Sequence, residues 1–290
     1  LCRDIAISLI AIAVVLAARS PEKIPEFINM FKSSTEYTPP PWKINMSQGN
    51  PVAEGASSGQ QPLPPKPAAS VDPALEIKNN YTFFSDDRYP SLNSSVEYSK
   101  AVGDLARIQE KMLRDRSQAR NYPDILIGNG RFTDKCDTGR PSIGLYYYGN
   151  GCKSILINFS SDGIAYEYPI EVLTVLAHEY AHHLVNATIG TDSVSDLDGE
   201  LIADCFAGLV HGYWDRYGKV NEQEVVAAAN MMIQVSTKDH MNTSAMHGVA
   251  GQRLGAFMGG ALKATGKESV EYNNFCRSLD RVIDWNKGLP

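Results

Sequence analysis

The chain lacks the usual marks of a nucleic-acid or nucleotide-binding protein. Its 290 residues contain no long run of Lys and Arg and no glycine-rich phosphate loop, and its net charge is −6 with a pI near 5.6. Binding to the phosphate backbone needs a basic surface. We therefore expect no nucleic-acid partner.

Long apolar runs are also scarce. The longest, Ile5 to Ala18, holds nothing more polar than Ser8 and is shorter than the roughly 20 residues that a membrane-spanning helix needs. It suits the apolar core of a signal peptide, with Val15-Leu16-Ala17 as a small-residue cleavage site. We assign residues 1–20 to a signal peptide or a membrane anchor. The protein is then secreted or tethered to a membrane, with its catalytic domain extracytoplasmic.

Proline is rare after residue 75, because eleven of the sixteen prolines lie in residues 19–75. Gly, Ser, Gln and Ala fill much of the same stretch, from Ser47 to Ser70. Such a composition cannot bury enough apolar surface to offset its ordering entropy. The sequence predicts a flexible linker over residues 21–75 and one folded domain over residues 76–290.

Cysteine is too sparse for a disulfide scaffold, with five in the chain. Cys136 and Cys152 flank a strand-and-turn region, and if paired they close a loop of about 17 residues, which stabilises by roughly 3 kcal/mol in the chain-entropy model. Cys205 is expected to be a buried core residue, with pairing to Cys276 as the alternative. Cys2 is left over.

Hydrophobic periodicity predicts an α+β fold that is mostly helical with a small sheet. The predicted strands are residues 124–128, 144–148 and 154–159. Helices are expected over 96–117, from Pro169 to Gly190, from a Ser195 cap to Gly218, around 225–233 and 254–262, and over 270–284. One of the strands is a candidate edge for binding an extended peptide.

The sequence His178-Glu179-Tyr180-Ala181-His182 is an HExxH motif. On a helix its two histidines lie on one face, one turn apart, so that both can bind one metal ion. Glu179 projects about 100° around the helix, beside the metal, where it can deprotonate a water molecule. The motif alone also arises by chance in helices.

A second block supplies what the first lacks. A catalytic zinc takes three protein ligands and keeps one open position, and Glu200 provides the third ligand if its helix packs against the HExxH helix. Asp204, one turn further on, can accept the free ring N–H of a ligating histidine. A structural zinc has no need of Glu179. The pattern therefore predicts a catalytic zinc site with the ligand logic of thermolysin-like peptidases.

Three blocks resemble the predicted neutral zinc metallopeptidase family: residues 178–183, residues 200–208, and residues 247–253, which read His-Gly-Val-Ala-Gly-Gln-Arg. Members are bacterial proteins with an N-terminal membrane segment and a periplasmic or extracellular domain. The resemblance covers residues 76–285 and implies a zincin-like fold, ligands His178, His182 and Glu200, and Glu179 as base. The cysteines ahead of the 155–158 strand also resemble that family. Departures are Ala181 for Gly, and Val185 and Ile202 for Gln.

Peptide hydrolysis through a tetrahedral intermediate also needs a donor to the oxyanion. His247 is the candidate, because it begins a predicted helix within a family block; a structural cap for that helix is the alternative. Tyr213 and His240 compete for this role. His183 is expected to point away from the zinc. Whether Gln252 and Arg253 hold their helix against the site stays open.

The expected function is zinc-dependent hydrolysis of a peptide or protein substrate. Two other classes stay open. One is a zinc amidase acting on cell-wall material. The other is a non-catalytic, membrane-tethered binding protein with a vestigial zinc site, for which Glu179 has no purpose.

Overall fold

The computed structural model describes residues 71–128, 145–149, 152–159, 166–190, 193–239, 250–266 and 276–290. The N-terminal segment, nearly all of the predicted linker, and Cys136, His240 and His247 lie outside the described residues. Within the described ranges, no helix has the length and apolar character needed to cross a membrane. The first helix of the described residues is α3 (Pro73–Glu76), which starts a few residues before the predicted start of the domain.

A four-stranded sheet forms one side of the structure, in the order β1-β2-β4-β3. β1 pairs with β2 and β2 with β4 in parallel, whereas β3 runs antiparallel to β4. The strands are β1 (Tyr81–Phe84), β2 (Asp124–Gly128), β3 (Leu145–Gly149) and β4 (Cys152–Asn158). The last three confirm the predicted strands to within two residues. β1 was not predicted, because its four residues gain strand character only by pairing with the distant β2.

One face of this sheet carries the main hydrophobic core. Side chains alternate between the two faces of a strand, and the core contains Ile125, Ile127, Ile155 and Ile157. Two helices pack against the sheet there: α4 (Ser95–Met112) and α5 (Pro169–Thr188). The alternate residues Leu126 and Leu156 form a separate small cluster. This arrangement confirms a mostly helical α+β fold with a small sheet.

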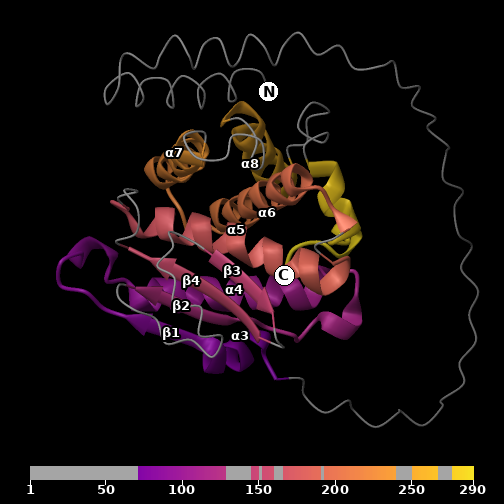
Figure 1. Ribbon diagram of the computed structural model, residues 1–290, viewed down its shortest axis with the longest axis horizontal. Helices are drawn as coiled ribbons and strands as arrows, with labels where there is room; N and C mark the ends of the chain where they lie inside the picture. Colours follow the sequence, from indigo (N-terminus) through magenta and orange to yellow (C-terminus); the bar gives the residue numbers. More distant parts are fainter. Residues whose placement is uncertain are drawn as a thin grey trace, which may run out of the picture.

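Helix α5 lies at the centre of the fold, between the sheet and the helices that follow it in the chain (Figure 1). It begins as predicted with Pro169 at the first turn, where a missing N–H costs nothing. The Glu171 carboxylate accepts the backbone N–H groups of Glu167 and Tyr168 at 2.6 and 3.1 Å. Gly190, at φ 78°, ends the helix, again as predicted.

Helix α6 (Asp196–Arg216) packs along α5 and is covered in turn by α8 (Ala250–Ala264) (Figure 1). Its Ser195 N-cap accepts the backbone N–H of Asp198 at 3.1 Å, as predicted, and Gly218 at φ 63° lies just after its C-cap, Tyr217. α7 (Glu222–Asp239) packs against α5 and α8. The three helices agree with the predicted positions.

The contact between α6 and α8 depends on glycines. A Cβ at Gly208 of α6 would lie 1.7 Å from the backbone oxygen of Phe257, and one at Gly260 of α8 would lie 1.9 Å from that of Cys205. A Cβ at Gly212 would lie 2.4 Å from the backbone oxygen of Ala261. The two backbones are therefore in direct contact, closer than any side chain would allow.

Two helices differ from the sequence prediction, one in where it ends and the other in its type. The helix predicted over 96–117 stops at Met112, because Leu113 instead forms a β-bridge with Ile283. The α-helix predicted over 270–284 is wrong within the described residues, where Arg277–Arg281 is a 3-10 helix. The backbone N–H of Asp284 donates to Met112 at 2.8 Å. Each exception comes from pairing between segments far apart in sequence.

Cys205 is a buried core residue, as expected, and the alternative of pairing with Cys276 is also correct. Cys205 and Cys276 form a disulfide with Cα atoms 5.5 Å apart. The bond ties α6 to the C-terminal segment beside α8, whose Ala256 carbonyl lies 3.4 Å from the Cys276 sulfur. Cys152 is also disulfide-bonded, and its predicted partner Cys136 lies outside the described residues.

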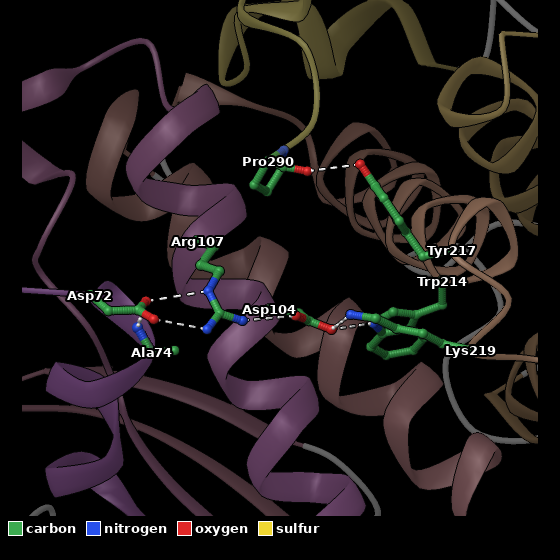
Figure 2. Close-up of polar contacts among 8 residues, drawn as sticks. All are labelled: Asp72, Ala74, Asp104, Arg107, Trp214, Tyr217, Lys219 and Pro290. Atoms are coloured by element: carbon green, nitrogen blue, oxygen red, sulfur yellow. Dashed lines mark hydrogen bonds and ion pairs between the residues drawn. The ribbon is translucent and has the colours of Figure 1, made fainter.

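A polar network joins the C-terminal end of α6 to α4 and α3 (Figure 2). The buried Asp104 carboxylate accepts from Trp214 Nε1 at 3.0 Å, Lys219 Nζ at 2.7 Å and Arg107 at 3.2 Å. Arg107 also donates to Asp72, the N-cap of α3, at 2.9 and 3.2 Å. A buried carboxylate is tolerated when donors surround it in this way.

His211 of α6 is buried between α5 and α8. Thr174 Oγ1 donates to the Ile170 carbonyl at 2.7 Å, so His211 Nε2, at 2.9 Å from that hydroxyl, must donate to it. His211 Nδ1 has no hydrogen-bond partner among the described residues. Burial lowers the pKa of His211 to about 3, because the charged ring would be removed from water and no described acceptor faces the proton added at Nδ1.

Acid should therefore weaken the fold through His211. Between pH 6.5 and 3 the unfolded chain binds a proton at this ring that the folded chain does not, so the free energy of unfolding falls as pH falls, with a slope of about 1.4 kcal/mol per pH unit. His211→Gln keeps an N–H donor but does not titrate. Urea unfolding at several pH values should show a shallower acid limb for His211→Gln. Parallel curves would contradict this assignment.

Candidate metal centre

His178 and His182 lie one turn apart on α5, as the motif predicts. Their Nε2 atoms are 3.1 Å from each other, and the rings are nearly perpendicular at 82°. His178 is buried, whereas His182 is partly exposed. Two imidazole nitrogens thus point to one position at the edge of the core.

Glu200 of α6 brings a carboxylate to the same position. Its Oε2 lies 3.2 Å from His178 Nε2, and its Oε1 lies 3.4 Å from His182 Nε2. Ligands bound tetrahedrally at 2.0–2.1 Å from zinc are roughly 3.3 Å apart. The observed separations fit that spacing. Among the described residues, the three predicted ligands form a group that could hold a metal ion.

Asp204 orients the first of these ligands. It lies one turn after Glu200 on α6, is fully buried, and its Oδ1 is 2.9 Å from His178 Nδ1. A carboxylate can only accept, so Nδ1 carries a proton and Nε2 is the ring nitrogen that faces His182 and Glu200. This is the role that the sequence predicts for Asp204.

The electrostatics of the two groups agree with that pairing. Burial raises the pKa of Asp204, but the charge and hydrogen bonds of Arg253, together with His178, outweigh it and hold the pKa below its usual value. Burial disfavours a charged His178, but hydrogen bonds to Asp204 and Glu200 outweigh it and raise its pKa to about 10. A metal ion bound there displaces a proton from His178.

Glu179 follows His178 directly and is partly buried. Its carboxylate does not belong to the group of converging ligand atoms. It is close enough to the buried Tyr166 for its charge to contribute to the raised pKa of that phenol, behind the larger effect of burial. The position beside the ligands, without contributing a ligand itself, is the one expected for a base.

His183 has a different role from its neighbour, as predicted. It points to the other side of α5, is fully buried, and donates from Nε2 to the Asn121 carbonyl at 2.7 Å. Burial lowers its pKa to about 4. His183 is a structural residue that fixes α5 to the loop after α4.

Of the three oxyanion candidates, the described residues include only Tyr213. It lies on α6 roughly 20 Å from Glu200, at about 1.5 Å rise per residue, where its ring contacts Lys219 and Tyr217. Tyr213 is therefore too far away, and this alternative is wrong. His247 and His240 lie outside the described residues.

Arg253 is the residue whose place the sequence left open. It extends from α8 to the centre, where its Nε and one terminal nitrogen each lie 2.8 Å from an oxygen of Asp204. The same terminal nitrogen is 3.5 Å from Glu200 Oε2. Its only sequence signal is its position in the third family block. Gln252, beside it, is partly buried.

Comparison with family models, with curated proteins and with solved structures gave no match. The site thus has to be interpreted from its own residues. These residues define a class of site in which two imidazoles (His178 and His182) and one carboxylate (Glu200) surround a single position. The carboxylate of Glu179 belongs to the residue next to His178 and is not part of this group.

Proposed function

We propose that the protein is a zinc-dependent hydrolase of peptide bonds with a zincin-like arrangement of α5 and α6, the two helices that carry His178, His182 and Glu200. The observation that carries this proposal is the convergence of His178, His182 and Glu200, whose nearest atoms are 3.1 to 3.4 Å apart in each pair and which offer one ligand atom each within 4.8 Å of one another. The resemblance of the three sequence blocks to the predicted neutral zinc metallopeptidases supports it.

The donor set favours zinc over other ions. Calcium and magnesium prefer sites built of oxygen ligands, whereas two imidazoles with one carboxylate are typical of catalytic zinc. Three protein ligands leave one position for water or substrate. Structural zinc sites instead take four protein ligands and are closed.

In the proposed reaction, Glu179 moves the proton. Zinc, when bound, supplies a Lewis acid that polarises the scissile carbonyl and makes water acidic near neutral pH. Glu179 accepts the proton of that water and delivers it to the leaving amine. His247 is proposed to donate a hydrogen bond to the oxyanion.

The sheet offers a surface for the substrate. Among the described strands, β3 ends the strand order, runs antiparallel to its neighbour β4, and packs against helix α5. We place an extended peptide along β3, where backbone pairing binds peptides of varied sequence. The proposed substrate is accordingly a peptide or an unfolded segment of a protein.

We place the catalytic domain outside the cytoplasm, secreted or tethered through residues 1–20. The disulfide between Cys205 and Cys276, and the disulfide-bonded state of Cys152, support this placement. Disulfides persist mainly in oxidising compartments.

The full chain, purified without chelators, tests this function. Elemental analysis should find a single zinc ion per chain, and a quenched peptide library should be cleaved. Removing the metal with 1,10-phenanthroline should abolish cleavage, and adding zinc should restore it. Cleavage of cell-wall amides alone would favour the amidase. Absence of any bound metal would remove the basis of the proposal.

A further inference from the structure

Arg253 is the largest fully buried side chain of the described structure, with 1 % of its surface exposed. Removing a guanidinium from water is energetically costly unless other groups compensate its charge. The apolar packing of α8 does not by itself require an arginine here. The contacts of its head group must therefore explain its presence.

These contacts form a two-pronged pairing with Asp204. Arg253 Nε donates to Oδ2 and a terminal nitrogen donates to Oδ1, both at 2.8 Å. Parallel N–H···O bonds of this kind fix the plane of a carboxylate as well as its position. Asp204 is held by α8 although it belongs to α6.

The orientation of Asp204 is transmitted to the metal ligand. Its Oδ1 accepts from Arg253 and also from His178 Nδ1, at 2.9 Å. The Asp204 carboxylate can only accept and Arg253 can only donate, so the bonds from Arg253 and from His178 to Oδ1 cannot reverse direction. The ring of His178 is thereby fixed with its Nε2 toward Glu200 and His182. Arg253 also lies 3.5 Å from Glu200.

We propose that Arg253 is a positioning residue of the metal centre, which sets metal affinity by holding Asp204 against His178 and by fixing Glu200. The metal centre is thus assembled from three helices, α5, α6 and α8, although its ligands come from two. This inference rests on the metal-binding part of the proposed function but not on peptide hydrolysis.

Arg253→Lys and Arg253→Gln test it. Lysine keeps the charge but cannot form the two parallel bonds. We expect both variants to bind zinc roughly 10–100-fold more weakly in competition with a chromophoric chelator, the usual cost of losing a partner that orients a ligand. The absorption spectrum of the cobalt-substituted protein should also change, because the position of His178 changes.

Lys263→Gln is the matched control. It removes a charge of the same sign from the same helix, and Lys263 contacts Asp280 and Trp285 instead of the metal centre. Zinc affinity should stay at the wild-type value. In an Asp204→Asn background, Arg253→Gln should weaken zinc binding far less than it does in the wild type, since the two short bonds of Arg253 are to Asp204 and its contact with Glu200 is longer.

The outcomes are separable. If wild type binds zinc and both Arg253 variants bind it equally well, the inference is overturned and the proposed function stands. If the wild type binds no zinc, the proposed function is overturned, and the inference that rests on its metal-binding part falls with it. Should the variants not fold, wild type provides the test: zinc should slow hydrogen exchange in α8 more than in α4. Equal slowing would overturn the inference.

Discussion

Replacing Glu179 by Gln is expected to eliminate peptide hydrolysis while zinc stays bound. The substitution keeps the shape of the side chain but removes the carboxylate that accepts the proton of water. General acid–base groups contribute roughly 10²–10⁴-fold to rate, so kcat should fall by at least that factor. Zinc affinity should change little, because Glu179 is not one of the converging ligands. Peptide turnover and zinc content of the same preparation measure both effects.

Glu200→Gln is the matched control, because it makes the same chemical change at the neighbouring carboxylate. Glu200 lies 3.2 Å from His178 Nε2, so this variant should lose zinc affinity together with turnover. If Glu179→Gln keeps wild-type turnover, Glu179 is not the base. If neither wild type nor variant cleaves peptides while both bind zinc, the non-catalytic binding protein becomes the better hypothesis.

The group of His178, His182 and Glu200, which could hold a metal ion, could be predicted from the sequence because its geometry is mostly local. His178 and His182 are brought together by one helical turn, and Glu200 and Asp204 by another. The structure adds that the two helices pack with the four side chains facing one another. The ligand set is therefore compatible with the prediction, while the identity of the metal stays a proposal.

Features that depend on distant pairing could not be predicted. β1 is a strand only because Tyr81–Phe84 lies beside β2. The end of α4 is set by the bridge between Leu113 and Ile283, although the helical pattern continues past Met112. The contact of Arg253 with Asp204 likewise depends on how α8 crosses α6, which neither helix specifies alone.

That crossing is specified jointly by glycines on both helices. Gly208 and Gly212 lie one turn apart on α6. Gly260 belongs to the facing helix α8 and approaches α6 near Cys205. The disulfide from Cys205 to Cys276 lies at the same contact. Since Arg253 extends from the first turn of α8, any displacement of this helix moves its guanidinium relative to Asp204.

Gly208→Ala should therefore damage both the fold and the metal centre. The added methyl would lie 1.7 Å from the Phe257 backbone oxygen, and backbone cannot rotate away as a side chain can. We expect the free energy of unfolding to fall by about 3 kcal/mol, at the upper end of overpacking effects. Zinc affinity should fall as well, because α8 must move away. Urea unfolding of the metal-free protein and chelator competition measure the two losses separately.

Gly199→Ala, on the same helix, is the control. Its added methyl would meet nothing closer than Val194 Cγ2 at 3.8 Å, which is ordinary contact. Alanine is a better helix former than glycine by up to about 1 kcal/mol, so stability should stay constant or rise. If Gly208→Ala is as stable as Gly199→Ala, the two helices are not in backbone contact. If it loses stability but binds zinc normally, the docking of α8 does not set the metal affinity.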